Sequence, residues 1–90
     1  MKTINTLNII AGKQTEVLNE LYKGHEILST GNRGMKILCY DWHQLPFWIT
    51  ISYNHDLTNY TYYEAFTEDS EDIMMLEEFS TFEELLNHIK

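Results

Sequence analysis

Histidine and cysteine are the residue types that most often carry catalysis or bind metals, and in this chain they are widely spaced. The gaps between successive histidines are 18, 12 and 33 residues, which does not match the short spacing of paired metal ligands. A lone imidazole is most often a surface or turn residue, so we predict no metal site and no catalytic residue. His43 is the strongest candidate, because Asp41 stands two residues before it. The four histidines are His25, His43, His55 and His88.

The single cysteine, Cys39, is predicted to lie in a strand, where a free thiol usually behaves as a small apolar side chain. A nucleophilic Cys-His pair with His43 would require a lowered thiol pKa, whereas the neighbouring anion Asp41 would raise it. One cysteine also cannot form an intramolecular disulfide, and a small secreted domain usually needs several. We therefore expect a cytoplasmic, non-enzymatic protein.

Carboxylates are concentrated in the C-terminal part of the chain. Residues 1–36 hold five basic and three acidic side chains, whereas residues 37–90 hold one basic and eleven acidic ones, and the net charge is −8. No lysine or arginine stands between Lys36 and Lys90. The segment cannot neutralise its own charge, and it would repel phosphates. We therefore expect no direct binding to nucleic acid.

The densest acidic run is Thr-Glu-Asp-Ser-Glu-Asp at residues 67–72. A calcium-binding EF-hand loop needs a central glycine and a terminal bidentate glutamate between two helices, and this run lacks the glycine and a preceding helix. We predict no metal or other cofactor. Repulsion between its like charges predicts an extended, solvated loop, for which solubility is a sufficient reason and partner binding is the alternative.

Tyrosines and methionines near these carboxylates indicate a binding surface, because interfaces often place adaptable apolar side chains within a charged surround. A basic protein, such as a nucleic-acid-binding protein or a nuclease, is the partner that this surface would suit. The predicted partner-binding residues are Glu64, Glu68, Asp69, Glu71, Asp72, Glu77, Glu78, Tyr60 and Tyr62.

A helix is predicted in the N-terminal third, because apolar residues recur at three- and four-residue intervals from Ile4 to Tyr22. Gly24 follows the last of them and predicts the helix end. Gly12 interrupts the pattern, so residues 4–23 form either one helix or two, with Thr15 capping the second.

Short β-branched and aromatic runs follow, which predict antiparallel strands. Residues 25–30 and 35–42 flank a glycine-containing turn and predict a hairpin, and residues 47–53 and 59–66 alternate in polarity. Residues 73–79 form either an edge strand or a helix. Thr81 and Glu84 match a capping box, which predicts a short C-terminal helix.

These elements predict one α+β domain over residues 1–90: an antiparallel β-sheet of four to five strands with an N-terminal helix and a short C-terminal helix packed on it. A chain of this size buries roughly two-thirds of its unfolded surface, which favours binding over strained catalytic geometry. The longest apolar runs are far below the roughly 20 residues that a membrane helix needs, and we expect no signal peptide, because Asn5, Asn8 and Gly12 interrupt the apolar residues near the N-terminus. We expect no membrane association.

In size, acidity and lack of catalytic motifs, the chain resembles the small inhibitors that phages and mobile elements use against host defences, including anti-CRISPR proteins and DNA mimics. The resemblance is compositional. It implies a stoichiometric inhibitor whose carboxylates stand where phosphates would sit in a basic cleft of another protein. Two alternatives stay open: an immunity or antitoxin protein that neutralises a basic nuclease, and a structural module that forms a homo-oligomer through Trp42, Trp48 and the tyrosines.

Overall fold

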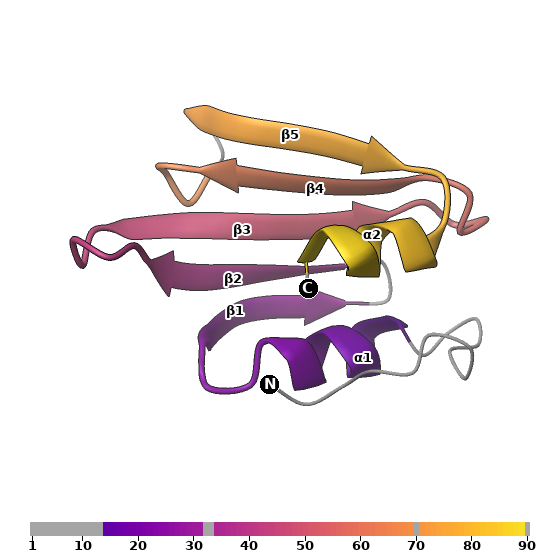
Figure 1. Ribbon diagram of the computed structural model, residues 1–90, viewed down its shortest axis with the longest axis horizontal. Coiled ribbons are helices and arrows are strands. Elements are labelled where there is room, and N and C mark those ends of the chain that lie inside the picture. Colours follow the sequence, from indigo (N-terminus) through magenta and orange to yellow (C-terminus); the bar gives the residue numbers. More distant parts are fainter. Residues whose placement is uncertain (1–13, 32–33, 70, 90) are drawn as a thin grey trace.

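The computed structural model describes residues 14–31, 34–69 and 71–89 and arranges them as an antiparallel sheet with two helices (Figure 1). The strands are β1 (Glu26–Gly31), β2 (Gly34–Tyr40), β3 (Pro46–Tyr53), β4 (Tyr60–Ala65) and β5 (Ile73–Phe79), and the helices are α1 (Gln14–Leu21) and α2 (Phe82–Ile89). Each strand pairs with the next in sequence, so the spatial order is β1-β2-β3-β4-β5. The predicted α+β class, with five strands between an N-terminal and a short C-terminal helix, is confirmed.

Helix α1 covers only part of the predicted N-terminal helix, because residues 4–13 lie outside the described residues. The backbone N–H of Tyr22 donates to the Leu18 carbonyl at 3.0 Å, and the chain then turns at Gly24, whose φ is 97°. Glycine adopts this left-handed conformation without steric cost, so the predicted helix end is confirmed. Thr15 lies inside α1 and does not cap it.

The C-terminal elements resolve the choice that the sequence left open, since residues 73–79 form strand β5 and not a helix. Thr81 precedes α2, and its hydroxyl oxygen accepts from the Glu84 backbone N–H at 3.2 Å. The same hydroxyl donates to the Glu84 carboxylate at 3.3 Å. The predicted capping pair is therefore present, with the carboxylate bound to the hydroxyl of Thr81.

The predicted hairpin of β1 and β2 is also present, and Gly31 pairs with Gly34 at its closed end. Gly34 has a φ of 146°, and a Cβ built there would lie 2.0 Å from the Ile51 carbonyl oxygen of β3. Only glycine fits this approach of β2 to β3 without a shift of the backbone.

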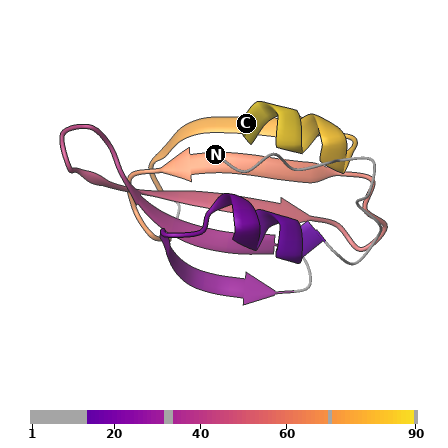
Figure 2. The ribbon, with the colours of Figure 1, turned by 60° about the horizontal axis from the view of Figure 1, so that its bottom comes forward.

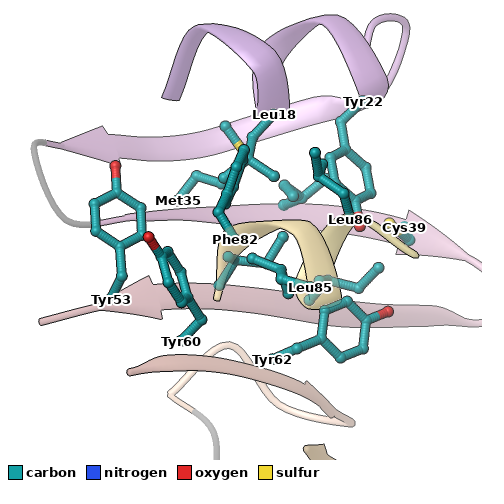
Figure 3. Packing of buried hydrophobic residues seen from close by; sticks show 13 residues of the cluster. Leu18, Tyr22, Met35, Cys39, Tyr53, Tyr60, Tyr62, Phe82, Leu85 and Leu86 are labelled. Atoms are coloured by element: carbon teal, nitrogen blue, oxygen red, sulfur yellow. The ribbon is translucent and has the colours of Figure 1, made fainter. Parts of the chain in front are cut away.

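Both helices lie on the same face of the sheet, which we call the helix face (Figures 1 and 2). Alternate residues of β2, β3 and β4 point into the core that the helices cover (Figure 3). The predicted inward side of β3 is confirmed, since Ile49, Ile51 and Tyr53 are buried. The fully buried side chains with the largest volumes are Leu18, Ile37, Ile51, Leu85 and Leu86.

The opposite face of the sheet, the open face, has neither described helix packed on it. The strand register places Lys36, Thr50 and Tyr63 side by side there, followed by Leu76 on β5. No helix of the described chain has the length and apolar character required to span a membrane.

Candidate partner-binding surface

Asp41 and His43, the strongest catalytic pair in the sequence, build a turn. The Asp41 carboxylate accepts the backbone N–H groups of His43 at 2.8 Å and Leu45 at 2.9 Å. The imidazole of His43 instead lies against the Trp42 ring, with 3.7 Å between ring centroids. The carboxylate thus fixes the β2–β3 turn and does not orient the imidazole, because its contact is with the backbone of His43.

Cys39 lies in the core, and the pKa of its thiol is raised above the ordinary value. Burial is the main cause that raises the thiol pKa, and the negative charge of Glu64 raises it further. The sequence had indicated Asp41 as the anion with this effect, and the fold assigns it to Glu64. Within the described residues, no group of three or more His, Cys, Asp or Glu side chains could hold a metal ion.

Two of the predicted partner-binding residues, Tyr60 and Tyr62, are only 2% and 6% exposed. They lie on the helix face and form part of the core (Figure 3). Their predicted role as surface anchors is therefore wrong, because alternation along β4 turns both rings inward. Glu64 shares their face and is half-buried, and its carboxylate accepts the Tyr62 hydroxyl at 2.8 Å. Burial is the main cause that raises the pKa of Tyr62, followed by this hydrogen bond.

Residues 67–72, here called the acidic loop, connect β4 to β5 and carry the exposed carboxylates of Glu68, Asp69, Glu71 and Asp72. The predicted extended conformation is wrong, because the described part of the loop is a turn closed by hydrogen bonds. The Glu71 N–H donates to the Thr67 hydroxyl at 3.0 Å, and the Phe66 N–H donates to the Asp72 carbonyl at 2.9 Å. The charges remain in water, where screening makes their mutual repulsion small compared with the turn hydrogen bonds.

Lys36 positions the acidic loop across the open face of the sheet. Its side chain starts on the open face of β2, and its ammonium donates to the backbone carbonyl of Glu68. The contact leaves the Glu68 carboxylate free of this ammonium. A shallow depression forms here, and its lining residues are Lys36, Thr67, Glu68, Asp69 and Glu71. Three predicted carboxylates are therefore brought together beside one lysine.

The remaining predicted carboxylates, Glu77 and Glu78, lie on β5 and point to opposite faces. Glu77 pairs with Tyr62 on the helix face, and Glu78 pairs with Thr61 on the open face. Both are exposed. The predicted acidic site is therefore divided between a loop cluster and an edge strand.

The sequence analysis named Trp42 and the tyrosines for an oligomer interface, but it did not predict that exposed apolar residues lie at the same end of the sheet as the acidic loop. The β2–β3 turn and the β4–β5 connection lie at the same end of the sheet (Figures 1 and 2). Trp42 in the turn is 85% exposed, and Phe66 in the connection is 60% exposed. We call the exposed apolar residues at this end, together with the acidic loop, the sheet-end surface. Its apolar members are Tyr40, Trp42, Leu45, Phe66 and Ile73. The sequence feature that could have indicated their exposure is the presence of large apolar residues within or next to polar turns.

The stability of the acidic loop is expected to depend on pH through the carboxylate of Asp69. Asp69 has a pKa below its ordinary value of 3.8, chiefly because its carboxylate accepts the Thr67 hydroxyl. A lowered pKa favours the folded loop above pH 3.8, and this contribution is lost as the pH falls through the folded pKa. We expect Thr67→Val to raise the pKa of Asp69 towards the ordinary value in an NMR titration of its carboxyl carbon. An unchanged pKa in the variant would mean that backbone N–H groups, and not Thr67, hold the carboxylate.

Comparison of the chain with protein-family models, with curated proteins and with solved structures finds no match.

Proposed function

We propose that this protein is a non-enzymatic binding protein that blocks a basic, nucleic-acid-binding surface of another protein by forming a stoichiometric complex. The observation that carries the proposal is the sheet-end surface. There, two connections distant in sequence lie at the same end of the sheet, and they carry the exposed apolar side chains and the carboxylates of the acidic loop.

The two components of this surface would act at different stages of binding. Unneutralised carboxylates attract a basic partner and speed its encounter, but exposed charge pairs contribute little affinity in water. Trp42 and Phe66 supply large apolar areas that lose their contact with water in a complex, and aromatic anchors of this kind dominate the affinity of many interfaces. A carboxylate cluster at the same end of the sheet as such anchors therefore suits a surface that otherwise binds phosphates.

Self-association is a second candidate function, and the exposure of Trp42 and Leu45 favours it. An exposed apolar patch at one end of a sheet is also typical of an oligomer interface. Salt distinguishes the two functions, because a complex formed by opposite charges weakens as ionic strength rises, whereas an apolar oligomer persists. Neutralisation of a basic nuclease, as by an immunity or antitoxin protein, uses the same surface and is one form of the first proposal.

The test begins with capture of partners from a lysate of the native host at low and at high salt, followed by mass spectrometry. The captured protein is then purified, and its binding to DNA or RNA is titrated with this chain. The proposal expects loss of nucleic-acid binding at one equivalent and a complex that weakens with salt. Recovery of the chain alone as a salt-resistant oligomer would contradict it, as would a ternary complex in which nucleic acid stays bound.

A further inference from the structure

Strand β5 is an edge of the sheet, and β4 is its one strand neighbour within the described chain (Figure 1). Alternate residues of an edge strand direct backbone N–H and C=O groups away from the sheet, where another strand can pair with them. Three apolar side chains of this strand are also exposed: Ile73 is 49%, Met74 41% and Leu76 50% exposed. The edge therefore offers hydrogen-bonding groups and uncovered apolar area together.

The opposite edge, β1, is less suited to an added strand. Its pairing with β2 shifts register between Ile27 and Ser29, which marks a bulge. A bulge twists an edge and interrupts its row of outward groups, and it is a common means of preventing strand addition. In β5 the register shift lies near its start, opposite Ala65, and the pairing from Met75 to Phe79 is regular.

Carboxylates flank the apolar segment of β5 on both sides. The apolar segment Ile73-Met74-Met75-Leu76 is preceded by Glu71 and Asp72 and followed by Glu77 and Glu78. Since Glu77 and Glu78 point to opposite faces of the sheet, cations on either face of an added strand would meet a carboxylate. Opposite charges facing each other across strands are stabilising, and like charges are destabilising.

This order disfavours a second copy of the chain as the added strand. In an antiparallel β5–β5 pair that aligns the two apolar segments, Asp72 would face Glu77 of the other copy. Glu71 would face Glu78 in the same way, and the symmetry of the pair repeats both repulsive contacts. Registers that avoid these contacts place carboxylates opposite apolar residues and leave part of the apolar segment uncovered.

We propose that β5 binds an extended segment of a basic protein as an added strand, with apolar side chains opposite residues 73–76 and lysine or arginine opposite both acidic ends. The inference rests on the proposed function, and it specifies that the basic partner binds through an extended segment. It is continuous with the sheet-end surface, because β5 begins where the acidic loop ends.

The experiment uses the full chain labelled with ¹⁵N and the synthetic peptide Lys-Lys-Val-Thr-Val-Thr-Lys-Lys. A second peptide has the same sequence with N-methyl groups on alternate central amides, which keeps the charge and removes the donors needed for strand pairing. A third has glutamate in place of lysine. We expect the first peptide to bind and to slow hydrogen exchange of alternate β5 amides, the second to bind at least about tenfold more weakly, and the third not to bind.

Two variants test the position of the added strand. Neutralising Glu77 and Glu78 to glutamine is expected to weaken binding of the first peptide several-fold, because two cross-strand charge pairs are lost. The matched control neutralises Glu26 and Glu83, which are exposed on β1 and α2, and is expected to leave the affinity unchanged. Circular dichroism of both variants checks that the fold is retained.

Equal binding of the methylated peptide, or binding without protection of β5 amides, would overturn strand addition while leaving the charge-driven function intact. Absence of binding by the lysine peptide would also overturn it. A dimer whose formation protects the β5 amides would assign the edge to a second copy and contradict the proposal. The proposed function fails on a different result, namely a captured partner that keeps its nucleic acid.

Discussion

Replacing Gly34 with alanine is expected to lower the free energy of unfolding by more than about 2 kcal/mol. The new Cβ would lie 2.0 Å from the Ile51 carbonyl oxygen and 2.9 Å from the Ser52 Cα, both backbone atoms of β3. These backbone atoms cannot move aside as the flexible end of a side chain can. The new Cβ would therefore push β2 and β3 apart, and both strands lie inside the sheet. The φ of 146° adds a conformational cost for any L-residue other than glycine. Urea denaturation followed by circular dichroism measures the effect.

Gly24→Ala is the control for the conformational part of this cost. Gly24 also has a positive φ, of 97°, but a Cβ there would meet no heavy atom within 4 Å. We expect the control to lose only about 1 to 2 kcal/mol, the usual cost of a left-handed alanine. Equal losses in the two variants would show that the close approach between β2 and β3 is not what excludes a side chain at position 34.

Neutralising Glu68, Asp69 and Glu71 to glutamine, asparagine and glutamine is expected to weaken the complex with the captured basic partner by about 30-fold. In the complex these carboxylates would be partly withdrawn from water, where a charge pair contributes more than a fully exposed one, so the loss of three such pairs gives an effect of this order. Amides are preferable to lysines, because Lys36 stands beside the loop and added cations would repel it. Titration calorimetry at several salt concentrations measures the affinity, and the variant should also show a weaker salt dependence.

The control neutralises Glu26, Asp56 and Glu83, which are exposed on β1, the β3–β4 connection and α2. It changes the net charge equally but leaves the acidic loop unaltered, so we expect the affinity to stay within about twofold. Similar losses in both triple variants would mean that net charge, and not the loop, attracts the partner. No loss in either would leave the acidic loop with a solubilising role.

Much of the fold was predictable because it depends on local patterns. Alternation along residues 47–53 predicted the buried side of β3, and Gly24 predicted the end of α1. Thr81 and Glu84 predicted the start of α2 from their spacing alone. These features depend on neighbouring residues, whose geometry is set by backbone conformation and short hydrogen bonds.

The candidate site was less predictable, because it depends on which residues tertiary packing brings together. Tyr60 and Tyr62 are close in sequence to the carboxylates, but the helices cover their side of β4 and bury them. Trp42 and Phe66 are 24 residues apart, yet the meander places their turns at one end of the sheet.

The sequence by itself determined the acidity, the absence of paired metal ligands at short spacing, and the order of strands and helices apart from residues 73–79, for which strand and helix both stayed open. The tertiary structure decided which carboxylates cluster, since the contact from Lys36 on β2 to the Glu68 carbonyl crosses β3 and β4 and has no local signal. It also decided that β5 is an edge and that its apolar residues stay exposed. The physical reason is that composition and periodicity are local properties, whereas exposure depends on what packs against each face.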